Sequence, residues 1–263
     1  DPALAPGLAD KIEAALLENR VDLAVHSMKD LPTTLPEGLV IGAVGRREDV
    51  RDALISREGL TLDALPLGAR VGTSSLRRQA QLRNRRPDLQ MADVRGNVDT
   101  RLGKVERGEY DAIILAKAGL DRLGLSKVIS EVLAPEVCLP AAGQGAIGIE
   151  MRVPANDFDR ELAVVLGQLN HTPSRLSVET ERAVLAGLSG GCDLPLGVWA
   201  REESGDFLLN ACVLSADGTE SVRVRRAGVA GDAEAIARAV TAELRSQGAD
   251  RLLDLGDRSH GAP

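Results

Sequence analysis

The strongest constraint on the fold is an alternation of strand-like and helix-like segments through the first 145 residues. Apolar runs such as 21–25 and 111–116 predict buried strands, and 75–85 has the apolar spacing of an amphipathic helix. Strands that alternate with helices are typical of α/β domains, whose sheets are mainly parallel and whose ligands bind at the carboxyl ends of strands. The other predicted strands span 39–45, 53–56, 69–74, 90–94 and 145–151, and the other predicted helices span 8–19 and 97–108.

Beyond residue 151 the pattern changes to helices followed by strands. The predicted helices span 158–170, 173–188 and 232–248, and the predicted strands span 196–200, 206–218 and 220–230. An Ala-Asp-Gly turn at the end of the second of these strands suits a hairpin. This region is therefore expected to form a separate α+β domain.

The composition excludes several classes of function. The net charge is −7 and the chain holds only two Phe, one Tyr and one Trp, so it lacks stacking platforms for nucleic acid. No run approaches the roughly 18 apolar residues of a membrane-spanning helix, and no signal peptide opens the sequence, which favours a cytoplasmic enzyme. The three cysteines and three histidines lack metal-ligand spacing, so we expect no metal.

One segment is strongly basic within this acidic chain. Residues 70–107 hold nine Arg and one Lys against four acids. In Val-Gly-Thr-Ser-Ser-Leu-Arg-Arg-Gln, small polar residues precede a helix whose first turn carries Arg77 and Arg78, where the helix dipole disfavours positive charge. A nearby anion would explain that placement. The alternatives are a solvated helix face and, less suited to two strand-end sites, a DNA-binding surface.

Two further stretches combine reactive side chains with backbone freedom. Lys29 and Asp30 follow the apolar strand 21–25, either as a surface ion pair or as a chemical site at a strand end. Cys192 lies in Gly-Gly-Cys-Asp-Leu-Pro, where it is either a tolerated small residue or a reactive thiol. Gln144 lies in a glycine-rich segment between the two modules, and the simplest interpretation of this segment is a hinge.

Taken together, these segments resemble the porphobilinogen deaminase (hydroxymethylbilane synthase) family. Eight motifs occur in the family's order: VHSMKDLP, REDVRDALIS, GTSSLRRQAQL, RRPDL, VRGNVDTRLGK, EYDAIILAKAGLDRLGL, LPAAGQGAIGIE and LSGGCDLPLG. The resemblance is continuous from about residue 10 to 200 and weaker thereafter.

The resemblance implies an α/β fold in which two periplasmic-binding-protein-like domains, with mainly parallel sheets, flank a cleft. A small C-terminal α+β domain carries the cysteine loop. The expected ranges are 1–46 with 145–166 for domain 1, 47–144 for domain 2 and 167–263 for domain 3. The family begins with an additional strand and helix, so the N-terminal part of domain 1 is expected to be missing here.

The resemblance also implies a transferase of tetrapyrrole synthesis that acts as a monomer. It joins four porphobilinogen molecules head to tail on a dipyrromethane cofactor bound to Cys192 through a thioether, and releases hydroxymethylbilane and ammonia. Asp30 is implied as the catalytic acid. The implied cofactor-binding residues are Ser27, Lys29, Thr73, Ser75, Arg77 and Arg78, and the implied substrate-binding residues are Arg95, Arg101, Arg122 and Gln144.

An alternative function is a non-catalytic anion-binding module of the periplasmic-binding-protein type. A two-domain α/β cleft is compatible with it, because a fold does not fix a function. That alternative gives Cys192 no role.

Overall fold

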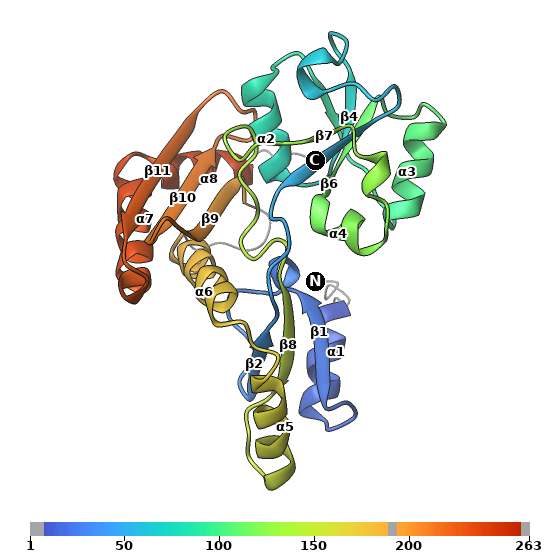
Figure 1. The fold of residues 1–263 in the computed structure, drawn as a ribbon. Helices are drawn as coiled ribbons and strands as arrows, with labels where there is room; N and C mark the ends of the chain where they lie inside the picture. Colours follow the sequence, from blue (N-terminus) through green and yellow to red (C-terminus); the bar gives the residue numbers. More distant parts are fainter. Residues whose placement is uncertain (1–7, 189–193, 259–263) are drawn as a thin grey trace.

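The computed structural model describes residues 8–188 and 194–258, which form three lobes, each built on one sheet (Figure 1). The predicted α/β class with a small C-terminal α+β domain is confirmed. Each sheet takes its strands from one of the three predicted domain ranges, and the boundaries themselves stay a prediction. None of the helices in the described ranges has both the length and the apolar character needed to cross a bilayer.

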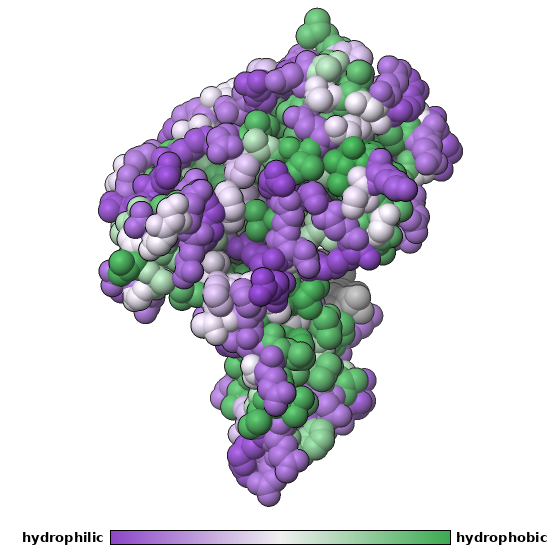
Figure 2. Space-filling view, viewed as in Figure 1, coloured by the Kyte–Doolittle hydropathy of each residue, from purple (hydrophilic) through white to green (hydrophobic). Residues whose placement is uncertain are grey.

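The first lobe is the narrow one at the bottom of Figure 1 and Figure 2. Its sheet has three strands in the order β1-β8-β2. Its strands are β1 (Leu23–Ser27), β8 (Ile147–Arg152) and β2 (Leu39–Val44), and the helices packed on it are α1 (Leu8–Leu17) and α5 (Asp157–Gly167). The short helix η1 (Met28–Asp30) follows β1 directly. Both β1 and β2 run toward the second lobe, so the polar segment after β1 lies where the lobes meet (Figure 1).

The predicted parallel pairing is wrong for this sheet. β8 lies between β1 and β2 and is antiparallel to both. The reason is the path of the chain: it leaves the sheet after β2, builds the whole second lobe, and returns through β8 in the opposite direction. Local periodicity cannot indicate this, because it identifies a strand but not its neighbour.

The second sheet is mixed and has the order β5-β4-β6-β3-β7. Its strands are β3 (Asp52–Ser56), β4 (Arg70–Gly72), β5 (Gln90–Ala92), β6 (Ala112–Ala116) and β7 (Glu131–Val132). β4 pairs in parallel with β5 and β6, whereas β3 is antiparallel to β6 and β7. The helices of this lobe are α2 (Leu76–Arg85), α3 (Val98–Glu106) and α4 (Lys117–Arg122), with short turns η2 (Leu62–Ala64) and η3 (Ser126–Val128). Apolar side chains are buried on both faces of the sheet.

The third sheet is an antiparallel meander in the order β11-β10-β9. Its strands are β9 (Leu196–Glu203), β10 (Asp206–Leu214) and β11 (Ser221–Gly228), and its helices are α6 (Thr172–Gly187), α7 (Ala233–Ser246) and α8 (Ala249–Arg258), with the turn η4 (Ala230–Asp232). The three helices share one apolar core with the strands. The β10 strand also contacts α2 of the second lobe.

A buried carboxylate joins the lobes. Glu181 of α6 is fully buried and accepts two hydrogen bonds from the Arg47 guanidinium, at 2.6 and 2.9 Å. It also accepts backbone N–H bonds from Gly143 (2.7 Å) and Ala200 (2.8 Å). The Glu181 side chain therefore binds three segments: the one that enters the second lobe, the one that returns from it, and a strand of the third sheet.

Candidate active site

The carboxyl end of β1 is held firmly by its neighbours. Met28 is 2% exposed, and its backbone N–H donates to the carbonyl of Ala146 at 3.0 Å. A Cβ added at Gly148 would lie 2.1 Å from Met28 Sδ, so only glycine leaves room for this side chain. Met28 thus anchors η1, and on this anchor Lys29 is half-buried and Asp30 is exposed.

The third lobe also holds this strand end. The Arg182 guanidinium of α6 donates to the backbone carbonyls of Met28, Leu31 and Pro32. The position of Lys29 and Asp30 therefore depends on α6 as well as on their own sheet.

At the centre of the site lies a buried carboxylate between two arginines. Asp52, at the start of β3, is fully buried and accepts from Arg77 Nη1 at 2.8 Å. It also accepts from Arg78 Nη2 at 2.7 Å and Arg78 Nε at 3.1 Å. Burial raises the pKa of the Asp52 carboxyl, but attraction to Arg77 and Arg78 and their hydrogen bonds outweigh burial and hold that pKa well below its usual range.

Two other buried side chains complete this cluster. Gln144 Nε2 donates to Asp52 Oδ1 at 2.9 Å and to the Val50 carbonyl at 2.7 Å. The Cys138 thiol donates to Asp52 Oδ2 at 3.3 Å, and burial raises the pKa of this thiol to about 12. Cys138 is therefore a protonated donor in the core and not a nucleophile.

Two small cavities meet at Lys29. The first, of about 50 Å³, is lined by Lys29, Ser75, Arg77, Ala141, Ala142, Leu185, Leu194 and Leu196. The second, of about 220 Å³, is lined by Lys29, Arg78, Gly96, Asn97, Val98, Arg101, Leu115, Ala116, Gly119 and Leu120. Among these described residues there are four cations and no acid, so both cavities favour an anion.

The pKa shifts of two lining side chains agree with a cationic lining. Burial lowers the pKa of the Lys29 ammonium, and the positive charge of Arg78 lowers it further, while the Asp30 carboxylate raises it. Burial and Arg78 also lower the pKa of the Arg101 guanidinium. The positive charge of Arg78 therefore disfavours the charged forms of both Lys29 and Arg101, and a bound anion would offset this repulsion.

Comparison with known proteins identifies the family. Residues 8–160 match the family model "Porphobilinogen deaminase, dipyromethane cofactor binding domain", and residues 175–246 match "Porphobilinogen deaminase, C-terminal domain". The chain is 51% identical to the porphobilinogen deaminase of Moorella thermoacetica over 243 residues, which cover 92% of this chain and 76% of that protein. The one from Desulforudis audaxviator is 50% identical over 243 residues, covering 92% and 77%. The chain belongs to the porphobilinogen deaminase family.

Similar solved structures include periplasmic binding proteins. An ancestral cationic amino acid solute binding protein aligns with a TM-score of 0.39 and 16% identity over 62% of this chain and 70% of that one. A Salmonella typhimurium periplasmic binding protein with high arginine specificity aligns with a TM-score of 0.37 and 15% identity over 60% and 70%. These scores are too low to establish a shared fold.

The residues that the family resemblance implied fall into separate groups. Lys29, Ser75, Arg77, Arg78 and Arg101 line the two cavities. Ser75 is the N-cap residue of α2 and lines the first cavity, and its side chain makes no capping hydrogen bond.

The remaining implied residues lie outside the two cavities. Thr73 is buried, and its Oγ1 accepts from the backbone N–H of Ser75 at 3.3 Å. Ser27 is half-buried at the end of β1, and Arg95 is exposed. Arg122 Nη2 donates to the carbonyl of Gly145 at 2.8 Å, so within the described part of the chain its observed contact is with the returning segment.

Gln144 lies inside the buried cluster and is 1% exposed. Its contacts are with protein groups, so sequence reasoning found its location between the lobes but not its partners. Cys192 lies outside the described residues.

Sequence reasoning missed Asp52. The charge at the start of α2 correctly indicated a nearby anion, but that anion is a side chain of the protein. The available signal was an acid opening the strand Asp-Ala-Leu-Ile-Ser, where an unpaired carboxylate would be costly.

Proposed function

We propose that the chain is a transferase that joins four porphobilinogen molecules head to tail on a covalent dipyrromethane primer. Each coupling releases one ammonia, and hydrolysis of the bond to the primer by water then releases hydroxymethylbilane. The observation that carries the proposal is the pair of cavities at Lys29, whose lining is cationic and free of acids among the described residues although the whole chain has a net charge of −7. Porphobilinogen bears an acetate and a propionate, so each added unit brings two carboxylates for these cations to pair with.

The residues at the cavities suit a polycarboxylate cofactor. Arg77 Nε is buried and has no hydrogen-bond partner within the described residues, so one donor of this guanidinium is available to a bound carboxylate. We infer that Arg77, Arg78, Lys29 and Ser75 bind the carboxylates of the dipyrromethane, with Thr73 and Ser27 as supporting residues. When bound, the dipyrromethane supplies the free pyrrole α-carbon at which the polymer begins.

We infer that Cys192 is the attachment point. Leu194 follows the segment that contains Cys192 and lines the first cavity, together with Leu185 of α6 and Leu196 of β9. An anchored primer makes the first coupling effectively intramolecular, which removes the entropic cost of collecting two free reactants.

We infer that Asp30 is the catalytic residue and acts as a carboxylate. Loss of ammonia from porphobilinogen leaves a methylene-pyrrolenine cation, and the ring that attacks it becomes cationic before it loses its α-proton. A carboxylate at this strand end stabilises positive charge in both species and can accept the proton. Its neighbour Lys29 pairs with a substrate carboxylate, so the two adjacent charged residues have different roles.

Substrate carboxylates would then be bound by the more exposed arginines. Arg101 lines the larger cavity beside the N-terminus of α3, and we infer that Arg95 and Arg122 extend this cationic surface as the polymer grows. For Gln144 the contacts with Asp52 favour a positioning role over direct contact with substrate. A cytoplasmic location and a monomeric state are proposals that follow from the family alone.

The anion-binding module is not favoured as an alternative, because it gives no account of a match to a cofactor-binding domain over residues 8–160.

An intact-mass measurement under denaturing conditions tests the cofactor assignment. We expect wild type to carry the extra mass of two linked pyrrole units. Cys192→Ser should lose that mass, while Cys212→Ser, a change at a buried cysteine of β10, should retain it. Equal masses for wild type and Cys192→Ser would contradict the attachment.

Ammonia release from porphobilinogen tests Asp30. Asp30→Asn should nearly abolish turnover while keeping the added mass and the helical circular dichroism. The matched control Asp63→Asn removes another exposed carboxylate, far from Lys29 in sequence, and should leave the rate unchanged. A wild-type rate in Asp30→Asn would overturn its catalytic role.

A further inference from the structure

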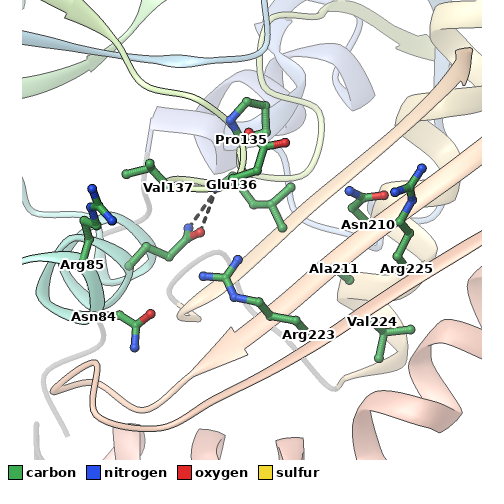
Figure 3. A pocket seen from close by; sticks show the side chains of 12 residues that line it. Asn84, Arg85, Pro135, Glu136, Val137, Asn210, Ala211, Arg223, Val224 and Arg225 are labelled. Atoms are coloured by element: carbon green, nitrogen blue, oxygen red, sulfur yellow. Dashed lines mark hydrogen bonds between the residues drawn. The ribbon is translucent and has the colours of Figure 1, made fainter.

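Glycines distinguish the cavities of the described structure. The largest, of about 680 Å³, lies between the second and third lobes, and Figure 3 shows Arg85 of α2 on one side of it and Arg225 of β11 on the other. No glycine is among its described lining residues. The cavity of about 220 Å³ at Lys29 is lined by two, Gly96 and Gly119. Each of them leaves open a volume that any other side chain would fill, so the reason for each bears on what this cavity admits.

The backbone explains Gly96. Its φ is +116°, a conformation that residues with a side chain rarely adopt. An added Cβ would also lie 2.7 Å from Cγ2 of Thr100, which is closer than two carbon atoms can approach. The segment before α3 therefore requires glycine at position 96, whatever the cavity binds.

Neither the backbone nor the packing explains Gly119. It is the third residue of α4, and its φ is not positive. Apart from its chain neighbours and the backbone of its own helix, an added Cβ would have no atom within 4 Å. Glycine destabilises a helix relative to alanine. Alanine at position 119 would therefore leave the fold at least as stable, and the reason for glycine is to be found outside the fold.

Gly119 lies on the face of α4 that borders the cavity. Ala116, Gly119 and Leu120 all line it, and positions three and four apart share one face of a helix. Lys117 and Asp121 form a salt bridge with each other on a different face. A side chain at position 119 would therefore leave α4 on the cavity side.

The rest of the lining suits a carboxylated ring. Lys29, Arg78 and Arg101 supply positive charge, and Val98 and Leu115 supply apolar surface. The carboxylates of such a ring can pair with the cations while its flat face packs against the apolar side chains. In a cavity of about 220 Å³, one added methyl group would occupy space that the ring needs.

We propose that Gly119 is a specificity-determining residue, whose missing side chain leaves room in this cavity for the pyrrole ring of porphobilinogen. The inference rests on the proposed transferase function and adds the residue that limits the size of the bound ring. The cations hold the carboxylates, and Gly119 sets how closely the ring approaches α4. A difference of one methylene in a pocket changes kcat/KM by about 10–200-fold, so alanine is a sufficient perturbation.

The kinetics of ammonia release test this role. Gly119→Ala should lower kcat/KM for porphobilinogen by about tenfold or more, and Gly119→Leu should lower it further. Gly119→Ala should keep the added mass of the primer and a urea midpoint at least equal to that of wild type. The matched controls are Gly167→Ala and Gly167→Leu at the end of α5, where an added Cβ also has no atom within 4 Å. Gly167 does not line the cavity, so both controls should keep the wild-type kcat/KM.

Binding without turnover separates this inference from the proposed function. The Asp30→Asn chain should retain the primer and turn over little, so calorimetric titration can measure its affinity for porphobilinogen. In this background we expect Gly119→Ala to weaken binding by about tenfold or more and Gly167→Ala to leave it unchanged. An Asp30→Asn chain that binds no porphobilinogen would contradict the proposed function, and the role of Gly119 with it.

Three results would overturn the role of Gly119 and leave the proposed function intact. The first is a wild-type kcat/KM in both Gly119→Ala and Gly119→Leu. The second is equal affinity for porphobilinogen in the Gly119→Ala and Gly167→Ala chains. The third is a urea midpoint of Gly119→Ala that falls together with its activity, because loss of folding and not loss of space would then explain the lower rate.

Discussion

Replacing Asp52 by Asn tests the central charge cluster most directly. The substitution keeps the shape of the side chain but removes the one negative charge that faces Arg77 and Arg78. Both guanidiniums are less than a tenth exposed, so neither can turn to water for compensation. The new amide group would also face the donors of both arginines and of Gln144.

Removal of one partner from a buried ion pair typically lowers the free energy of unfolding by about 3–5 kcal/mol. Asp52 serves two guanidiniums, so we expect the upper part of that range, about 4–5 kcal/mol. A urea m-value of about 1–3 kcal/mol/M then predicts that the unfolding midpoint falls by more than about 1 M. Equilibrium urea unfolding followed by circular dichroism measures this change.

The matched control is Asp63→Asn, which makes the same chemical change against Arg85 at the other end of α2. Both partners there are more than half exposed, so we expect no measurable change in the midpoint. In a double-mutant cycle, Asp52→Asn with Arg78→Gln should cost less than the two single losses added together, since it leaves one fewer unpaired charge. A midpoint for Asp52→Asn equal to that of Asp63→Asn would refute the reasoning.

The contribution of Asp52 to the free energy of unfolding should decrease at low pH. The pKa of the Asp52 carboxyl lies well below its usual range in the folded chain and near its ordinary value of about 3.9 in the unfolded chain. Its contribution is therefore complete above that ordinary pKa and is lost as the pH falls below it. The difference in unfolding free energy between wild type and Asp52→Asn should be constant near neutral pH. It should narrow progressively as the pH falls below about 4.

Three further outcomes follow from single contacts. Cys138, whose pKa is raised to about 12 by burial, should resist iodoacetamide in the native chain at pH 8 and react after unfolding, as peptide mass spectrometry would reveal. Gly148→Ala pushes a methyl group against the buried methionine of η1 and should cost about 1–3 kcal/mol, whereas Gly167→Ala meets no atom within 4 Å and should not destabilise. Glu181→Gln should lower the unfolding free energy by about 3–5 kcal/mol, because Arg47 keeps its buried charge without a partner.

Local periodicity predicted most elements of this fold. The strand expected at 21–25 is β1 (Leu23–Ser27), and the helix expected at 75–85 is α2 (Leu76–Arg85). The direction of β8 could not be predicted in this way, because its antiparallel neighbours are more than 100 residues earlier in the chain. Pairing is decided by which apolar faces meet, and that information is spread over all three lobes.

Some residues of the candidate site could be predicted from the sequence, and others could not. Lys29 and Asp30 could be identified from their position alone, since polar residues directly after an apolar strand lie at its carboxyl end. The partner of Arg77 and Arg78 could not, because Asp52 precedes them by 25 and 26 positions on another strand.

The internal carboxylate explains how this site can be both stable and attractive to anions. Asp52 orients Arg77 and Arg78 by fixed hydrogen bonds, yet it cancels only one of the four positive charges that line the two cavities. A second internal acid would stabilise the empty site further but would remove the attraction for carboxylates. Asp52 therefore holds the two guanidiniums in place while neutralising one positive charge. A polycarboxylate chain would neutralise the remaining positive charges as it binds.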